Sequence, residues 1–296
     1  MTARELGFLL LTSSLGDPER KPLTTAQFRD LTANVRNMSR PQSDADVTPE
    51  DLIKLGYDYD TAARILMLLS QKALAERYVR RGFEMQCFPL VRLNTNYPDL
   101  LRKKLGMDAP GTIWIKGDIS LLSQKSISLV GSRELKEDNM DFAREAGYQA
   151  AAQGYVLVSG NARGADRVAQ DACLAEGGKV ISVVADELCN QPENANILYL
   201  SEDGYDLPFS AQRALQRNRV IHCLSQTVLV AQSALGKGGT WNGTAKNLRF
   251  GWTPVCCYHD GSDAAEELAR LGAEMIGTKD LLDLSQLPQP EKGFLD

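Results

Sequence analysis

The chain has 296 residues, a formal net charge of −5, 43% hydrophobic residues and 24% charged residues. These proportions fit a globular protein of one large and one small domain, and the acidic total excludes nucleic-acid binding by overall charge. No apolar run approaches the roughly 20 residues that span a bilayer. The first residues lack the basic lead-in and cleavage site of a signal peptide. We therefore expect a cytoplasmic protein without membrane contact.

The cysteines and histidines do not form a metal-binding pattern. Six cysteines are present without a Cys-x-x-Cys pair, and the only histidines are His222 and His259. Free cysteine packs as a small hydrophobic side chain. We expect reduced, buried thiols, no metal and no cofactor.

The first 85 residues are predicted to be helical. Residues 24–27 and 48–51 both resemble helix starts, the second with Pro at the first turn and acids near the positive end of the helix dipole. Residues 60–80 show helical spacing and are expected to form one helix that stops at Gly82. The polar residues 39–46 are expected to be a loop. Together these segments indicate a small helical domain over 1–85.

Strands and helices alternate over the next part of the chain. The expected strands lie at residues 112–116, 126–131, 155–160, 179–185, 226–231, 253–259 and 273–276. The expected helices lie near 99–105, 138–153, 165–176, 244–250 and 263–271. Residues 186–225 are predicted to be helical or loop. This alternation predicts an α/β domain over 86–285 with a doubly wound, mostly parallel sheet, followed by a flexible tail at 286–296.

Three glycine-containing loops follow predicted strands, at the sheet edge where open α/β proteins bind ligands. In the first, Gly131 allows close backbone approach, Ser132 can donate a hydrogen bond and Arg133 can grip a phosphate. The second, residues 159–166, offers backbone N–H groups and a helix N-terminus as an anion site. The third, residues 235–244, is again glycine-rich before a helix. Three such loops together indicate a phosphate-bearing ligand.

The known nucleotide motifs and the local charge narrow the kind of ligand. Neither the P-loop pattern nor a G-x-G-x-x-G after the first strand is present. Residues 207–259 contain no Asp or Glu, and this segment predicts a basic face suited to several consecutive phosphates. Its cations are Arg213, Arg217, Arg219, Lys237, Lys246 and Arg249. Some of the arginines near 217 are candidates for structural pairs with carboxylates such as Asp166.

These motifs occur in an order that resembles the DNA-processing protein A family, also called DprA or Smf. The resemblance covers about residues 95–260. It is carried by Val-Gly-Ser-Arg at 130–133, by Ser-Gly-x-Ala-x-Gly-x-Asp at 159–166, by Arg-Asn-Arg at 217–219 and by the glycine-rich 236–244. The chain departs from the family pattern with Gln232 in place of a glutamate and with an altered third loop. It is also expected to be a divergent member that lacks a C-terminal winged-helix module.

The resemblance implies an extended Rossmann-like fold behind an N-terminal helical domain of the SAM or helix-hairpin-helix type. It implies a non-catalytic protein that binds single-stranded DNA, hands it to the RecA recombinase during DNA uptake, and dimerises through its sheet domain. The residues implied in phosphate contact or in lining the groove are Gly131, Ser132, Arg133, Ser159, Gly160, Arg163, Gly164, Asp166, Arg217, Asn218, Arg219, Lys237, Gly238, Gly239, Thr240 and Lys246.

Two alternatives use the same loops. A phosphoribohydrolase of nucleoside monophosphates needs an acid three residues after the threonine of its Gly-Thr pair. That place falls on Gly243 or Asn247 here, depending on which Gly-Thr pair is used, and neither residue is an acid or a base. A sensor of a small nucleotide needs a closed, base-sized pocket, whereas DNA needs an open groove, and the sequence does not separate the two. Trp241 could stack on a base in either case, although packing on the sheet is its commoner fate.

Overall fold

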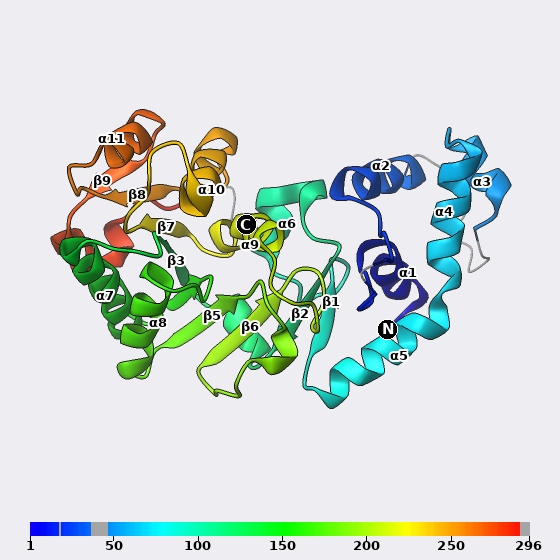
Figure 1. Ribbon diagram of the computed structural model, residues 1–296, viewed down its shortest axis with the longest axis horizontal. Helices are drawn as coiled ribbons and strands as arrows, with labels where there is room; N and C mark the ends of the chain where they lie inside the picture. Colours follow the sequence, from blue (N-terminus) through cyan, green and yellow to red (C-terminus); the bar gives the residue numbers. More distant parts are fainter. Residues whose placement is uncertain (18, 37–46, 291–296) are drawn as a thin grey trace.

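The computed structural model describes residues 1–17, 19–36 and 47–290 of the chain (Figure 1). One nine-stranded sheet runs through the molecule in the order β1-β2-β6-β5-β4-β3-β7-β8-β9. The strands are β1 (Phe88–Val91), β2 (Thr112–Lys116), β3 (Ser126–Val130), β4 (Val156–Ser159), β5 (Lys179–Val183), β6 (Ile197–Ser201), β7 (Thr227–Val230), β8 (Val255–Tyr258) and β9 (Glu274–Ile276).

The sheet is parallel from β6 to β9, and only β1 and β2 join it antiparallel. From β3 the chain winds outward through β4 and β5 to β6, then returns to β7 on the other side of β3 and winds outward again. The predicted doubly wound, mostly parallel α/β sheet is therefore confirmed. Its two windings diverge between β3 and β7, and ligands of such sheets bind at the carboxyl ends of the strands there.

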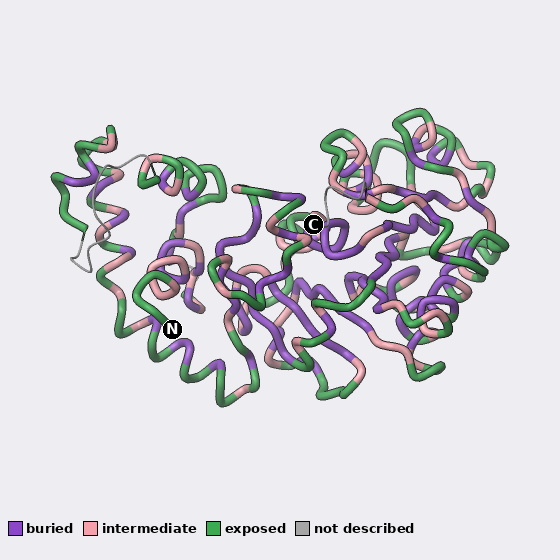
Figure 2. The backbone as a smooth tube through the Cα atoms, turned by 180° about the vertical axis from the view of Figure 1, so that it is seen from behind, coloured by how far each residue is buried: buried purple, intermediate pink, exposed green. Residues whose placement is uncertain are grey.

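Helices cover both faces of the sheet. α7 and α8 pack with α1 and α5 in one apolar cluster, and α6, α9 and α11 pack in the other. Figure 2 shows the strands buried between these layers. The helices are α1 (Ala3–Thr12), α2 (Thr25–Arg36), α3 (Pro49–Lys54), α4 (Tyr59–Ser70), α5 (Lys72–Glu84), α6 (Asp99–Leu105), α7 (Glu137–Ala152), α8 (Ala165–Ala175), α9 (Ala211–Cys223), α10 (Gly238–Phe250) and α11 (Asp263–Arg270).

Three expected elements differ from the structure. The segment predicted as helical or loop at 186–225 contains α9 but also the strand β6, whose five residues are all buried. This strand was not predicted because its apolar run is short and lies between polar loops. The single helix expected at 60–80 is two helices, because the chain bends at Gln71, whose side chain accepts a hydrogen bond from Arg20 Nε at 2.7 Å. The helix expected at 244–250 begins earlier, at Gly238.

The helices of residues 1–84 share a small core of their own and also contact the sheet core. Phe28, Leu52 and Ile65 belong to the separate cluster, whereas Tyr78 of α5 belongs to the large one. The Tyr78 ring stacks on Tyr205 with centroids 4.4 Å apart, and its hydroxyl donates to Asp206 at 2.6 Å. The N-terminal helices are thus anchored to the loop after β6, and the division at residue 85 stays a prediction.

The described part of the segment predicted as a tail is packed. Leu287 is buried, and Thr227 donates a hydrogen bond to the Pro288 carbonyl at 2.6 Å. Residues 291–296 of the same prediction, and residues 39–46 of the predicted loop, lie outside the described residues. In the part of the chain that the structure describes, none of the helices has the length and apolar character to cross a membrane.

The contact between α7 and α8 leads to a stability prediction. A Cβ added at Gly147 would lie 2.1 Å from the backbone oxygen of Ala169, so the two helices would have to separate. We expect Gly147→Ala to lower the free energy of unfolding by about 1–3 kcal/mol, the usual result of overpacking. Urea denaturation of the two proteins measures the difference.

Gly7 in α1 provides the matched control, because a Cβ there meets nothing within 4 Å. Gly7→Ala should leave stability unchanged or raise it by up to about 1 kcal/mol through helix propensity. Equal effects of the two substitutions would contradict the close α7–α8 contact.

Candidate nucleic-acid interface

A cavity of about 410 Å³ opens at the carboxyl edge of the sheet where the two windings diverge. It is built by the loops after β3, β4 and β7 together with the facing sides of α9 and α10. Its lining residues are Val130, Gly131, Ser132, Arg133, Ala162, Asp166, Ala211, Ala214, Leu215, Arg217, Asn218, Ile221, His222, Ala234, Lys237, Gly238, Gly239 and Thr240. We call it the switch-point pocket. The three predicted loops are therefore brought together.

The first loop contributes a free cation. Arg133 is exposed at the pocket and makes no ion pair or side-chain hydrogen bond with another described residue. Ser132 has a different task, because its backbone N–H and its hydroxyl both donate to the Gln232 carbonyl, at 3.0 and 3.3 Å. The serine fastens the loop after β3 to the loop after β7. Arg133 is thus held at the pocket mouth by a fixed backbone.

The second loop does not offer the open anion cradle that its sequence predicts. The Asp166 carboxylate itself accepts the backbone N–H groups of Gly160 at 3.1 Å and Ala162 at 3.3 Å. These are the donors expected to hold a phosphate. The chain's own carboxylate satisfies them, so the loop is closed on itself and Asp166 is a structural acid in this position.

Two other residues predicted for this loop lie outside the pocket lining. Ser159 is fully buried and its hydroxyl accepts a hydrogen bond from Gln170, so it faces the core and not the pocket. Arg163 is exposed and makes no ion pair with a described residue, but it does not line the pocket. Gly164 has a φ of +90°, and a Cβ there would lie 2.4 Å from the Ser132 carbonyl oxygen. Glycine at 164 therefore allows the first two loops to touch.

Arg217 of α9 lies between the second loop and the pocket. Arg217 is only 7% exposed, and its Nη2 donates to the Gly160 carbonyl at 2.9 Å. Its Nε has no hydrogen-bond partner among the described residues. A Cβ on Gly160 would lie 1.6 Å from Arg217 Nη1, so the glycine makes room for the guanidinium. A buried guanidinium with an unused N–H is suited to an anion in the pocket.

Arg217 and Asp166 influence each other electrostatically. Burial raises the pKa of the Asp166 carboxyl, and the positive charge of Arg217 and the two loop N–H groups oppose that rise. Burial likewise lowers the pKa of Arg217, and Asp166 opposes it. The two charges compensate each other inside the protein.

The third loop is the start of α10. Lys237 is exposed at the N-cap position, lines the pocket and has no ion-pair partner among the described residues. The Thr240 hydroxyl donates to the Gly131 carbonyl at 2.9 Å, and the Asn218 amide donates to the Gly239 carbonyl at 3.0 Å. These bonds fix the N-terminus of α10, including Gly238, over the loop after β3. Its positive dipole end faces the same cavity.

The remaining predicted cations lie away from the pocket. Arg219 forms an ion pair with Glu202 and donates to the Asp108 carbonyl at 2.7 Å. Arg213 pairs with Asp203 at 3.0 Å. Lys246 lies near the other end of α10. Arg219 and Lys246, which were predicted to line the DNA groove, do not line this pocket, because the helical period turns 219 away from 217 and places 246 nearly two turns beyond Thr240.

The sequence interpretation missed a side of α9. Ala211, Ala214, Leu215 and His222 line the pocket together with Asn218. Their spacing of three, four and seven residues is that of one helix face. Steps of three, four and seven residues from Asn218, the spacing of one helix face, would have identified these residues in the sequence. Trp241, in contrast, is partly buried against the sheet cluster, as expected for a packing residue.

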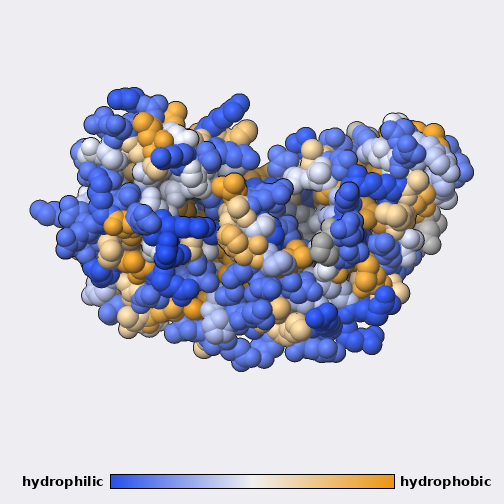
Figure 3. All heavy atoms as spheres, viewed as in Figure 1, coloured by the Kyte–Doolittle hydropathy of each residue, from blue (hydrophilic) through white to orange (hydrophobic). Residues whose placement is uncertain are grey.

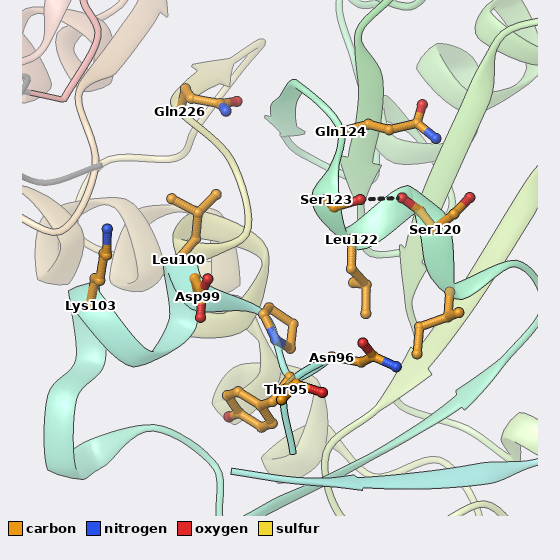
Figure 4. A pocket seen from close by; sticks show the side chains of 13 residues that line it. Thr95, Asn96, Asp99, Leu100, Lys103, Ser120, Leu122, Ser123, Gln124 and Gln226 are labelled. Carbon is orange, nitrogen blue, oxygen red and sulfur yellow. Dashed lines mark hydrogen bonds between the residues drawn. The ribbon is translucent and has the colours of Figure 1, made fainter. Parts of the chain in front are cut away.

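Figure 4 shows a second cavity, of about 400 Å³, at the opposite edge of the sheet. Gln124 precedes β3 and Gln226 precedes β7, so this cavity lies at the amino ends of the strands. Its lining is mainly amide and hydroxyl, and includes the carboxylate Asp99, which pairs with Arg102 at 2.6 Å. Among the described residues, one lysine, Lys103, and no arginine line it. The switch-point pocket is the better anion site.

The fold and pocket define a Rossmann-like α/β protein with a cationic site at its topological switch point. Residues 89–286 match the family model of DNA recombination-mediator protein A. The chain belongs to this family, as its motifs predicted. Among curated relatives it is 32% identical over 142 residues to Protein Smf of Escherichia coli, with 44% of this chain and 38% of that protein covered.

Further similarities agree with this family. The chain is 31% identical over 141 residues to the DNA processing protein DprA of Streptococcus pneumoniae, covering 44% of this chain and 50% of that protein. The solved structure of S. pneumoniae DprA matches 98% of this chain and 99% of its own, with a TM-score of 0.74 and 23% identity. A solved Helicobacter pylori DNA processing protein A matches 67% of this chain and 94% of its own, with a TM-score of 0.55 and 24% identity. The matched segments span at most about half the length of the curated relatives.

His222 beneath the pocket gives a pH prediction. Burial, with a smaller effect of Lys104, lowers its pKa from 6.5 to about 3. Between pH 3 and pH 6.5 the unfolded chain binds a proton at this histidine that the folded protein does not bind. The contribution of His222 to the free energy of unfolding is therefore complete above pH 6.5 and is lost as the pH falls toward 3. We expect stability to decline by up to about 1.4 kcal/mol per pH unit from this group.

The comparison with His222→Gln isolates the effect of the histidine from that of the carboxylates. Urea midpoints measured from pH 7 down to about 4.5 should fall more steeply for the wild type than for the variant. Parallel curves would show that His222 takes up its proton in the folded protein as readily as in the unfolded chain.

Proposed function

We propose that this protein binds single-stranded DNA through its phosphates at the switch-point pocket and leaves them chemically intact. The observation that carries this proposal is the set of cations at the cavity. Arg133 and Lys237 lack ion-pair partners among the described residues, and Arg217 keeps an unused Nε. Among the described residues, the only acid lining the cavity is Asp166, which already accepts two loop N–H groups. Such a surface attracts several consecutive phosphates.

The relatives support the kind of ligand. The H. pylori protein is described by its structure as having a single-stranded DNA binding mode. By analogy we propose that this chain takes part in DNA uptake or recombination in the cytoplasm, assists the loading of RecA onto the strand, and acts as a homodimer formed through its sheet domain. The helical part, residues 1–85, is proposed to be a domain of its own, with the sheet domain over 86–285.

Hydrolysis of a nucleotide is disfavoured by the environment of Asn247. It stands at one of the two places for the acid of a phosphoribohydrolase, and it is fully buried. Its amide oxygen accepts from the Thr253 N–H at 2.9 Å, and its nitrogen donates to the Thr253 carbonyl at 3.0 Å. This amide therefore closes the C-terminal end of α10 inside the protein. The other place, Gly243, has no side chain.

A small-nucleotide sensor is the second candidate. The cavity of about 410 Å³ falls within the range of small-molecule sites, roughly 300–1,000 Å³. Thermal-shift measurements with mononucleotides test it. A large shift that persists in high salt would favour the sensor, whereas DNA binding should be strongly salt-dependent.

The double variant Arg133→Ala plus Lys237→Ala tests the DNA proposal. Removing two cations that lie at the pocket should weaken binding of oligo-dT at least tenfold and should reduce the slope of log affinity against log salt by roughly 1.4 for two lost single-strand phosphate contacts. Fluorescence anisotropy at several salt concentrations measures both quantities.

Arg144→Ala plus Arg270→Ala is the matched control, because both arginines are exposed on other helices and pair with neighbouring acids. This variant removes the same charge but should retain the wild-type salt slope within about 0.5. Equal losses in the two double variants would indicate non-specific attraction and would refute the pocket as the binding site.

A further inference from the structure

The C-terminal end of α10 carries a feature that the switch-point pocket does not use. Phe250 and Trp252 stack with ring centroids 5.5 Å apart and planes within 9° of parallel. Lys246 Nζ lies 5.7 Å from the Trp252 ring centre, and Arg249 Cζ lies 5.6 Å from that of Phe250. We call these four side chains the α10 aromatic ladder.

The ladder is open to solvent and has no acid of its own. Phe250 is 56% exposed, an unusual degree for a phenylalanine, and Trp252 is half-buried against the sheet cluster. Lys246 and Arg249 form no ion pair with a described residue, and they lie within the acid-free segment 207–259. Packing therefore explains Trp252 but not Phe250, and the two cations remain available to a partner.

The ladder is continuous with the pocket along one helix. Asn242, Lys246 and Arg249 are spaced by four and seven residues, so with Phe250 they share one exposed side of α10. The N-terminus of the same helix lines the pocket at Gly238 and Thr240. At 1.5 Å per residue the two ends lie about 18 Å apart. A polyanion that leaves the pocket along this side of α10 reaches the ladder.

We propose that the α10 aromatic ladder is a second contact for the same single strand, in which a base stacks on Phe250 and its phosphates lie beside Lys246 and Arg249. The positive charge of Lys246 and Arg249 and the solvent exposure of Phe250 fit this occupant. Stacking on an aromatic ring tolerates every base, and nearby cations attract the backbone. On the face drawn in Figure 3, hydrophobic groups are scattered among hydrophilic ones. The inference rests on the proposed DNA function.

Phe250→Ala is the central test, with two ligands of equal length and charge. One is oligo-dT of about 16 nucleotides, the upper end of common single-strand site sizes. The other is the same backbone without bases. We expect the substitution to weaken oligo-dT binding about tenfold and to leave binding of the abasic strand unchanged, because only the first ligand can stack. Equal affinities of wild type and variant for oligo-dT would overturn the proposal.

Three further variants separate stacking from other effects. Phe250→Tyr keeps a ring and should restore binding, whereas Phe250→Leu keeps an apolar side chain without a ring and should behave like alanine. Tyr59→Ala removes a 74% exposed ring from α4 and should change nothing. If leucine restores binding as well as tyrosine does, the contact is not stacking. Because Phe250 is exposed, thermal melting of the variants should match the wild type.

The double variant Lys246→Ala plus Arg249→Ala tests the two cations. It should weaken the binding of both ligands and lower the slope of log affinity against log salt by roughly 1.4. An unchanged slope would show that the two cations do not contact the strand.

Failure of this inference differs from failure of the proposed function. If the wild type does not bind oligo-dT, both fall. If it binds and the pocket variant Arg133→Ala plus Lys237→Ala loses affinity while the ladder variants do not, only the ladder assignment is wrong.

Discussion

The hydrogen bonds from Gly160 and Ala162 to the Asp166 carboxylate organise the binding edge of this protein. They close the loop after β4 and give Arg217 an internal counter-charge, which allows a guanidinium to lie buried beside a cavity. A buried cation without such a partner would be strongly disfavoured. The Asp166 carboxylate therefore occupies the N–H groups of the second loop that a phosphate would otherwise use. It also stabilises Arg217, a cation that can attract a phosphate. Without this contact, neither the shape of the loop nor the position of Arg217 would be fixed.

From this constraint follows a division of the basic residues into two groups. Arg213 and Arg219 connect α9 to the loops after β6 and α6, where acids and carbonyls use their charge. Four other cations form no ion pair with a described residue, and residues 207–259 contain no acid that could pair with them: Arg133, Lys237, Lys246 and Arg249. An acidic protein thus retains a local cationic surface for an anionic polymer. The pocket and the α10 aromatic ladder are the two ends of that surface.

The sequence permitted much of the architecture to be predicted. Short runs rich in apolar residues, such as 126–130 and 227–230, are typical of strands buried on both faces, and the helices between them made a parallel sheet the expected result. β6 was missed because its five residues lie among polar loops without a periodic signal. The start of α10 was placed too late because glycines at 238 and 239 oppose helix propensity, and hydrogen bonds from Asn218 and Thr240 overcome that cost.

By itself the sequence determined the family, the order of the three loops and the acid-free segment that makes one surface basic. Composition and spacing are properties of the chain and survive without coordinates. Only the tertiary structure decided which donors and cations remain free. Ser159 turned inward, Arg219 paired with Glu202, and the second loop's N–H groups bonded to Asp166. Such pairings join residues of different elements, and a hydrogen-bond donor can be used only once at full strength, so the folded arrangement alone determines what is left for a ligand.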